Sequence, residues 1–341
     1  MAQKKLGSST IQFQNPIFIA GNGTVAGPNE CKGPLGSYFD IKLTEDTWQE
    51  DTYEKTELKM YYTAVRKAIQ DAGKTKEEIE FMLGGDLLNQ IVTSGYSARQ
   101  LEIPFLGLYG ACSTMAESLI VGSMVIDGGF ADHVVCAASS HFATAERQFR
   151  YPLELGTPKP PTGQNTVTGA GATVLSTTDD KKDGISPTYA TIGSVVDMGI
   201  TDANNMGAAM APAAAQTILT HLEDTGRDAQ YYDLIVTGDL GSFGSKLLFE
   251  ICSNQGVNIK ENFLDCGYLI YDGLPDTYCG GSGCGCSAIT LNGYLMDQIR
   301  KGKLSKIFFV ATGALLSPLV VQQGESIPSI AHGIAIERKK S

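Results

Sequence analysis

The sequence predicts an α/β fold built from two similar halves. Three observations indicate this: strands that are apolar along their whole length, alternation of such strands with helical segments, and a weak internal repeat. The strands HVVCAA (133–138) and KIFFVA (306–311) are apolar throughout, as expected where helices cover both faces of a sheet. Alternating strands and helices require crossover connections and favour parallel pairing.

The repeat consists of matching segments in the same order. Residues 64–90 and residues 213–244 each read as an amphipathic helix, a polar turn and a strand that ends at Gly-Asp-Leu. In both halves a Gly/Cys/Ser turn then opens a helix, which is followed by an apolar strand. The cysteines of these turns, Cys112 and Cys286, lie 174 residues apart. Matches that occur in the same order in both halves predict a duplicated unit.

The boundary between the halves is a charged connector. Residues 179–187, DDKKDGISP, combine alternating charges with Gly and Pro, which is typical of a linker between two packed units. We therefore divide the chain into residues 1–180 and 181–341.

Composition restricts the class of protein. With 43% hydrophobic and 18% charged residues over 341 positions, the chain is typical of a folded globular protein. Its net charge of −11 argues against nonspecific nucleic-acid binding and against a membrane helix held by charge. No signal peptide and no run of 18 apolar residues is visible. Eight scattered cysteines indicate reduced thiols in a cytosolic compartment.

The turn LGLYGACSTMAES (106–118) places a cysteine before a predicted helix. Thr114 followed by Glu117 matches a capping box, so Cys112 is expected just ahead of the helix N-terminus. Backbone N–H groups there favour an anion, which is either a thiolate or the carboxylate of a ligand. The alternative is that a small residue is needed in a tight turn. Position alone leaves these readings open.

The turn and its neighbours resemble the thiolase superfamily. The resembling segments are the Cys112 turn and CAASSHFATAERQFRYP (136–152) followed by GAGATVL (169–175). This resemblance implies a five-layer α/β/α/β/α sandwich with mixed, mostly parallel sheets and with both central helices buried between them. It also implies a homodimer joined through the strand IPFLGLYG (103–110), and it gives Cys112 the place of the acyl-accepting nucleophile.

The chain departs from the enzymes of this superfamily in its second half. Where ketosynthase members carry a histidine, this chain has Gly238 and Asp239, and where they carry an asparagine it has GGSGCGCSA (280–288). Loss of groups that stabilise an oxyanion removes several kcal/mol of barrier lowering. We therefore expect no enzyme activity. The alternative is a Cys112-based acyltransferase or condensing enzyme acting on acyl thioesters, with His141 or His332 as the base.

A closer resemblance is to the stage V sporulation protein AD family, thiolase-like proteins of spore-forming bacteria. The runs that carry it include AGPNECKGPLG (26–36), GACSTMAES (110–118), SSHFATAERQFRYP (139–152) and DMGITDANNMGAAMAPAAA (197–215). It implies binding of dipicolinic acid, with or without calcium, during uptake into developing spores. It also implies a soluble, cytoplasmic protein of the forespore that is held at the spore inner membrane by membrane proteins of the same uptake system.

The predicted ligand contacts come from the first half of the chain. A flat aromatic dianion needs an apolar slot with donors at its ends, and a guanidinium can grip a carboxylate through two bonds. Arg147 is the expected guanidinium, although Arg150 is an open alternative and either could instead form an ion pair. His141 is equally open as a structural residue, and a carboxylate at Asp86 would need a proton, a basic neighbour or calcium. The expected set is Asp86, Cys112, Glu117, Ser140, His141, Thr144 and Arg147.

No metal site or cofactor is expected. Cys279, Cys284 and Cys286 have the spacing C-x4-C-x-C without a second pair, which does not match a four-ligand zinc site.

Overall fold

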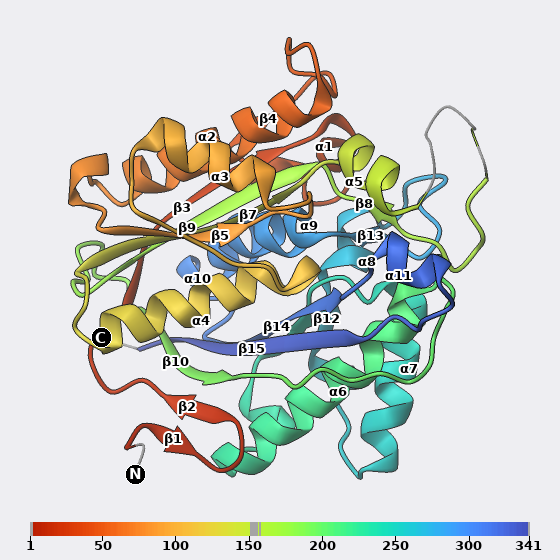
Figure 1. Cartoon of the computed structure of the whole chain (residues 1–341). Coiled ribbons are helices and arrows are strands. Elements are labelled where there is room, and N and C mark those ends of the chain that lie inside the picture. Colours follow the sequence, from red (N-terminus) through yellow and green to blue (C-terminus); the bar gives the residue numbers. More distant parts are fainter. Residues whose placement is uncertain (1–2, 151–155, 157, 340–341) are drawn as a thin grey trace.

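The computed structural model describes residues 3–150, 156 and 158–339. Two sheets stack with helices outside and between them, so the expected five-layer arrangement is confirmed (Figure 1). The first sheet has the order β4 (Ile41–Lys42), β3 (Phe18–Ala26), β9 (Gly169–Ser176), β7 (His133–Ser140), β5 (Phe81–Gly85), β6 (Phe105–Gly107).

The second sheet repeats this plan with one addition from the start of the chain. Its order is β1 (Lys5–Leu6), β2 (Thr10–Gln12), β10 (Ile185–Thr191), β15 (Ser329–Arg338), β14 (Lys306–Ala314), β11 (Leu234–Thr237), β12 (Phe263–Asp265). Residues 5–12 therefore extend the sheet of the second half, although they lie in the first half of the sequence. A short parallel pair, β8 (Asn165–Thr166) and β13 (Gly281–Ser282), joins the halves.

Both sheets are mixed, as expected. Parallel pairing holds for three of the five strand pairs described in the first sheet and for two of the six in the second. In each half, both neighbours of β5 and of β11, the strands that end near Asp86 and Asp239, run parallel to them. The carboxyl ends of these strands therefore meet at the sheet edge where a ligand cleft is expected.

The helices form three layers around the sheets (Figure 1). The first sheet is covered by α2 (Tyr53–Asp71) and α3 (Val92–Leu101), and the second by α6 (Met206–Thr225) and α7 (Gly241–Asn254). Between the sheets lie α4 (Thr114–Asp127), α9 (Cys284–Ile289) and α10 (Met296–Arg300). The shorter helices are α1 (Pro28–Lys32), α5 (Phe142–Phe149), α8 (Cys266–Ile270) and α11 (Pro318–Gln322).

The central helix α4 explains why the sequence around it is apolar on most sides. It contacts β5 and β7 of one sheet and β14 and β15 of the other. Met115, Leu119 and Ile126 are fully or almost fully buried, because neither flank of the helix meets water. This helix carries the Cys112 turn into the middle of the molecule.

Packing in this layer can be tested with Leu119. Leu119→Ala should lower the free energy of unfolding by about 2 to 5 kcal/mol, since the cavity would lie between two sheets. Val125→Ala, on the partly buried end of the same helix, is the matched control and should cost less. Urea denaturation monitored by circular dichroism measures both. Equal losses would contradict the sandwiched position of α4.

Candidate functional site

Cys112 lies where the two halves of the fold meet. It sits in a single 3-10 turn, Ala111–Ser113, between β6 and α4. The turn approaches β14 closely: a Cβ atom on Gly313 would lie 2.2 Å from the carbonyl oxygen of Gly110. Only glycine allows these two backbones to pack together at this point. The thiol is consequently placed against residues of the second half.

The expected capping box is not present, and that prediction was wrong. Thr114 is the first residue of α4, and its hydroxyl donates to the carbonyl of Ala111 instead of capping the helix. The Oε2 atom of Glu117 is buried without a hydrogen-bond partner in the described structure, and burial raises the pKa of this carboxyl. The 3-10 turn already leads into the helix, so no side-chain cap forms at Ser113.

The neighbour of the thiol is a carboxyl group. Asp239 follows β11 and is hydrogen-bonded to Cys112. Its Oδ1 accepts from the Thr312 hydroxyl at 2.6 Å, and its Oδ2 accepts from the Gly283 N–H at 2.9 Å. Asp239 thus stands where the superfamily resemblance places a histidine.

The electrostatics of this pair keep the thiol protonated. Burial raises the pKa of the Cys112 thiol well above its usual value, and the negative charge of Asp239 adds to the effect. Burial also raises the pKa of Asp239 to about 7, although the hydrogen bonds from Thr312, Gly283 and Cys112 oppose this rise. A thiol with a raised pKa is a weak nucleophile at neutral pH.

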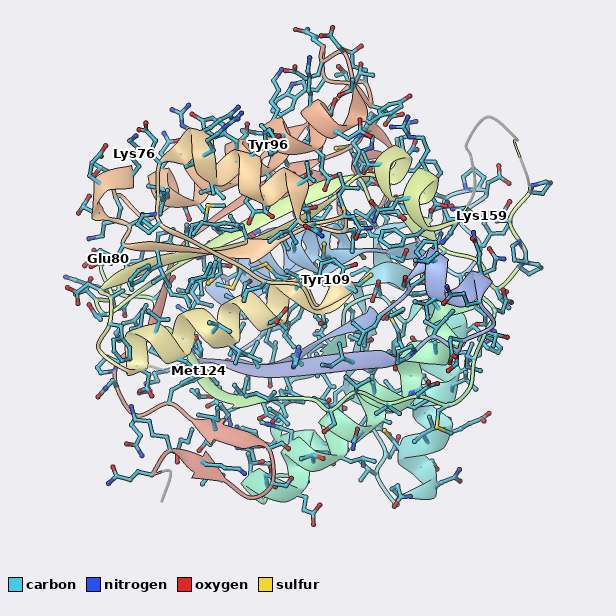
Figure 2. The ribbon with its side chains drawn as sticks, viewed as in Figure 1. Lys76, Glu80, Tyr96, Tyr109, Met124 and Lys159 are labelled. Carbon is cyan, nitrogen blue, oxygen red and sulfur yellow. The ribbon has the colours of Figure 1, made fainter. Side chains whose placement is uncertain are left out.

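A narrow cleft opens beside Cys112. Its walls are mainly apolar and come from both halves of the chain. Figure 2 shows Tyr109, one of its lining residues, next to the start of α4. The lining residues are Leu87, Tyr109, Ala111, Cys112, Ala145, Phe149, Arg150, Thr166, Met206, Ser282, Gly283, Ala314 and Leu316.

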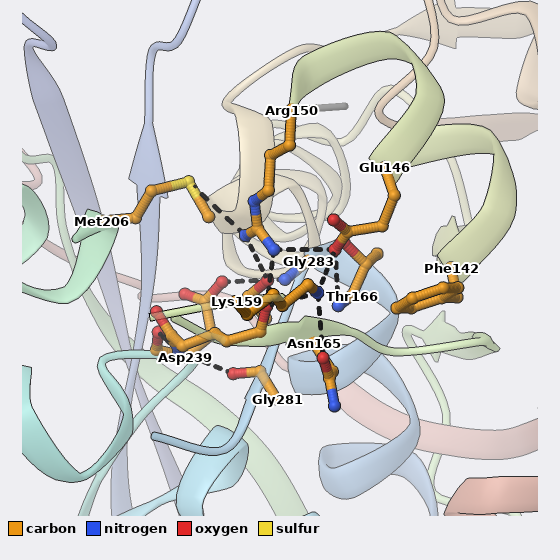
Figure 3. A network of polar contacts seen from close by, with 12 residues as sticks. Phe142, Glu146, Arg150, Lys159, Asn165, Thr166, Met206, Asp239, Gly281 and Gly283 are labelled. Atoms are coloured by element: carbon orange, nitrogen blue, oxygen red, sulfur yellow. Dashed lines mark hydrogen bonds and ion pairs between the residues drawn. The ribbon is translucent and has the colours of Figure 1, made fainter. Parts of the chain in front are cut away.

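One wall of the cleft carries a buried ionic network (Figure 3). The Arg150 guanidinium donates to Glu146 Oε1 at 2.7 Å, and Lys159 Nζ lies 2.9 Å from the same oxygen. Arg150 also reaches the hydroxyl of Ser282 at 3.3 Å, and Thr166 donates to Glu146 at 3.1 Å. All three charged side chains are buried or nearly so.

The network holds more positive than negative charge. Two cations share the single carboxylate of Glu146, and burial lowers the pKa of Lys159 to about 8 while Glu146 opposes that change. A buried cation without its own counter-ion gains from an added anion. The wall at Arg150 is therefore suited to receive a carboxylate.

Of the seven residues expected to contact the ligand, Cys112 alone is among the described residues lining this cleft. Asp86 instead holds the start of α3: its oxygens accept from the N–H of Leu88 at 2.9 Å and from the N–H and hydroxyl of Ser94 at 2.8 and 2.7 Å. Burial raises the pKa of Asp86, which these hydrogen bonds oppose. A carboxyl so engaged is satisfied without calcium or a ligand.

The candidates near the end of β7 are also engaged within the protein. Ser140 donates to the carbonyl of Val167 at 2.7 Å, and Thr144 donates to Glu57 at 2.8 Å. His141 Nδ1 accepts from the backbone of α5 at 3.1 Å, and its Nε2 lies 2.9 Å from the carbonyl oxygen of Asp46. These contacts fix the β7–α5 turn, which places Arg150 one residue beyond the helix.

Arg147 and His332 lie away from the cleft. Arg147 is partly exposed and forms an ion pair with Glu54 at 2.7 Å. An ion pair in place of a ligand contact is the alternative that the sequence left open for this residue. His332 Nδ1 accepts from the N–H of Gly193 at 3.2 Å, and burial lowers the pKa of its imidazole to about 4.

The described residues contain no cluster of histidine, cysteine and acidic side chains that could hold a metal ion. Nor is any helix in the described ranges both long and apolar enough to cross a membrane.

Comparison with known proteins agrees with this architecture. The 3-oxoacyl-[acyl-carrier-protein] synthase III of Aquifex aeolicus superposes with a TM-score of 0.57 at 15% identity, covering 94% of this chain and 99% of that one. Cerulenin-bound OleA of Xanthomonas campestri superposes with a TM-score of 0.60 at 15% identity, covering 96% and 97%. At this level of identity the likeness shows the fold, which is that of thiolase-like enzymes.

Sequence comparison gives the family. The profile of "Stage V sporulation protein AD (SpoVAD)" matches residues 7–337. Stage V sporulation protein AD of Bacillus subtilis (strain 168) is 50% identical over 335 residues, covering 98% of each chain. The chain belongs to the stage V sporulation protein AD family.

Proposed function

We propose that this chain binds dipicolinic acid in the cleft at Cys112 during uptake of the compound into developing spores. The observation that carries the proposal is the wall at Arg150, where two buried cations share one carboxylate. The chain as a whole carries a net charge of −11, so a dianion needs such a local excess of positive charge. Calcium could accompany the ligand as its chelate, but no group of the described residues requires it.

The cleft has the chemistry for a flat aromatic acid. Phe149, Met206 and Leu316 supply apolar surface for a ring, and Arg150 supplies a guanidinium for a carboxylate. A ligand carboxylate would take over the weak 3.3 Å contact that Arg150 makes to Ser282. Because the cleft is narrow, binding requires its side chains to move apart.

Binding can be measured by calorimetric titration with dipicolinate, with and without calcium. Arg150→Gln should weaken binding by about 30- to 150-fold, since a charge-assisted bond is worth about 2 to 3 kcal/mol. Arg147→Gln is the matched control from the same helix region and should change affinity by less than about twofold.

Benzoate, a monoanion with one carboxylate, should bind much more weakly than dipicolinate. The proposal fails if the folded wild-type chain binds no dipicolinate in either condition. If Arg150→Gln and Arg147→Gln lose affinity equally, the assignment of Arg150 as the arginine that contacts the ligand is wrong. Circular dichroism checks that each variant is folded.

A second function, acyl transfer by Cys112, rests on one observation. The Asp239 carboxyl is hydrogen-bonded to the thiol and could accept its proton. Against this, the thiol is held neutral, and the described residues that line the cleft include no histidine. We therefore propose that the protein is not an enzyme.

Incubation with short-chain acyl thioesters tests the absence of turnover. Intact-mass spectrometry should find no acyl adduct on Cys112 that is converted to product. Cys112→Ala serves as the control for acylation elsewhere on the chain. An adduct that forms on the wild type and turns over would establish the acyltransferase instead.

We also propose a homodimer. Strand β6 is the last strand of the first sheet in the described structure, and Leu106 within it and Tyr109 just after it are exposed. An apolar edge without charges favours pairing with another strand.

The partners of this dimer would be membrane proteins of the uptake system, which hold it at the spore inner membrane from the forespore cytoplasm.

Sedimentation at micromolar concentration tests the dimer. The wild type should sediment as a dimer, and Leu106→Lys should shift it toward monomer, because a charge would enter the strand pairing. Leu319→Lys, at a more exposed leucine of the second half, should leave the dimer unchanged. A wild-type chain that is monomeric throughout would contradict the proposal.

A further inference from the structure

Two connecting segments of the second half carry exposed apolar side chains and lead to residues that line the cleft. Residues 192–205 lead from β10 to α6, and residues 315–328 form the loop between β14 and β15 that contains α11. Among their exposed side chains are Val195, Met198, Leu319 and Val320, with exposed fractions of 57, 66, 67 and 40%. We call these four residues the apolar rim.

The two segments form one ordered surface. The N–H of Ile327 donates to the carbonyl of Ile200 at 2.7 Å, and Val196 and Ser329 exchange two backbone hydrogen bonds of 2.8 Å. The Ser326 hydroxyl donates to Asp197 at 2.5 Å. Beneath the rim, side chains of both segments pack into the same core cluster, including Val196, Ile200, Leu316, Val321 and Ile327. The exposed apolar groups are therefore held in place by the fold.

The segments that carry the rim reach the cleft. Leu316, three residues before Leu319, is a lining residue of the cleft. Met206, which begins α6 after the first segment, is another. Figure 1 shows α11 at the right-hand end of the sandwich, where the β14–β15 loop projects from the second sheet. A partner seated on the rim would stand beside the opening at Cys112.

The charge of the two segments is one-sided. Residues 192–205 and 315–328 contain no lysine or arginine. Their acids are Asp197, Asp202 and Glu325, all exposed. An apolar centre bordered only by carboxylates is complementary to an apolar surface bordered by lysine or arginine. Cytoplasmic loops of membrane proteins carry such an excess of basic residues.

We propose that the apolar rim is the docking surface for a basic cytoplasmic loop of a membrane protein, which thereby faces the mouth of the ligand cleft. The inference rests on the proposed uptake function, because it assigns the handover of ligand to this end of the molecule. The surface is separate from β6, which stays available for the homodimer.

The test uses inverted membrane vesicles from sporulating cells that lack the gene for this chain. Purified wild type should co-sediment with them saturably, more strongly in 0.1 M than in 0.5 M salt. Met198→Glu/Leu319→Glu should reduce this binding at least tenfold, because charges would enter the apolar centre. Phe130→Glu, at an exposed apolar residue after α4, is the matched control and should bind as the wild type does.

Three further measurements decide what occupies the rim. Vesicles treated with protease, and protein-free vesicles of phosphatidylglycerol, should not bind the wild type; binding to the latter would assign the rim to lipid and overturn the proposal. Loss of the dimer in the double variant would assign the rim to a second copy. Equal vesicle binding by wild type and double variant, or none by either, also overturns it. Dipicolinate titration of the double variant should match the wild type, so failure of docking is distinguished from failure of ligand binding.

Discussion

The buried carboxyl of Asp239 is the interaction around which the centre of the molecule is organised. It accepts one hydrogen bond from Thr312, near the end of β14, and another from Gly283, in the turn before α9. It is also hydrogen-bonded to Cys112, which precedes α4. A carboxyl removed from water must find such donors or lose several kcal/mol. Its burial therefore holds three chain segments from both halves at one point, and the cleft at Cys112 opens beside that point.

This arrangement supports our proposal that the thiolase-like fold of this chain keeps a cysteine without acyl-transfer chemistry. The geometry around Cys112 depends on backbone packing, such as the close approach of Gly313 to Gly110, and this packing does not require a reactive thiol. With Asp239 as its neighbour, the thiol stays protonated and serves as a small wall of the cleft. Function then follows from the residues grafted onto the fold.

Charge is distributed unevenly over an acidic chain. The buried network of Arg150, Lys159 and Glu146 concentrates positive charge at the cleft, where an anionic ligand would need it. The apolar rim close by has no cation in its two segments. Ligand and partner would therefore be recognised at the same end of the molecule by surfaces of opposite charge. The ligand would meet the basic network and the partner would meet the acidic and apolar rim, so the two interactions would not compete.

The fold and the family could be predicted from the sequence, because apolar strands, an internal repeat and long specific motifs are visible in the order of residues alone. The sequence also placed Cys112 just ahead of a buried helix. It could not decide which polar groups face the cleft. His141 and Arg147 lie in the right segment, but their partners come from residues 46 and 54, whereas Arg150 faces the cleft because α5 ends before it. Hydrogen-bond partners distant in sequence are decided by tertiary packing, and the side chains left over for a ligand are known only when those partners are in place.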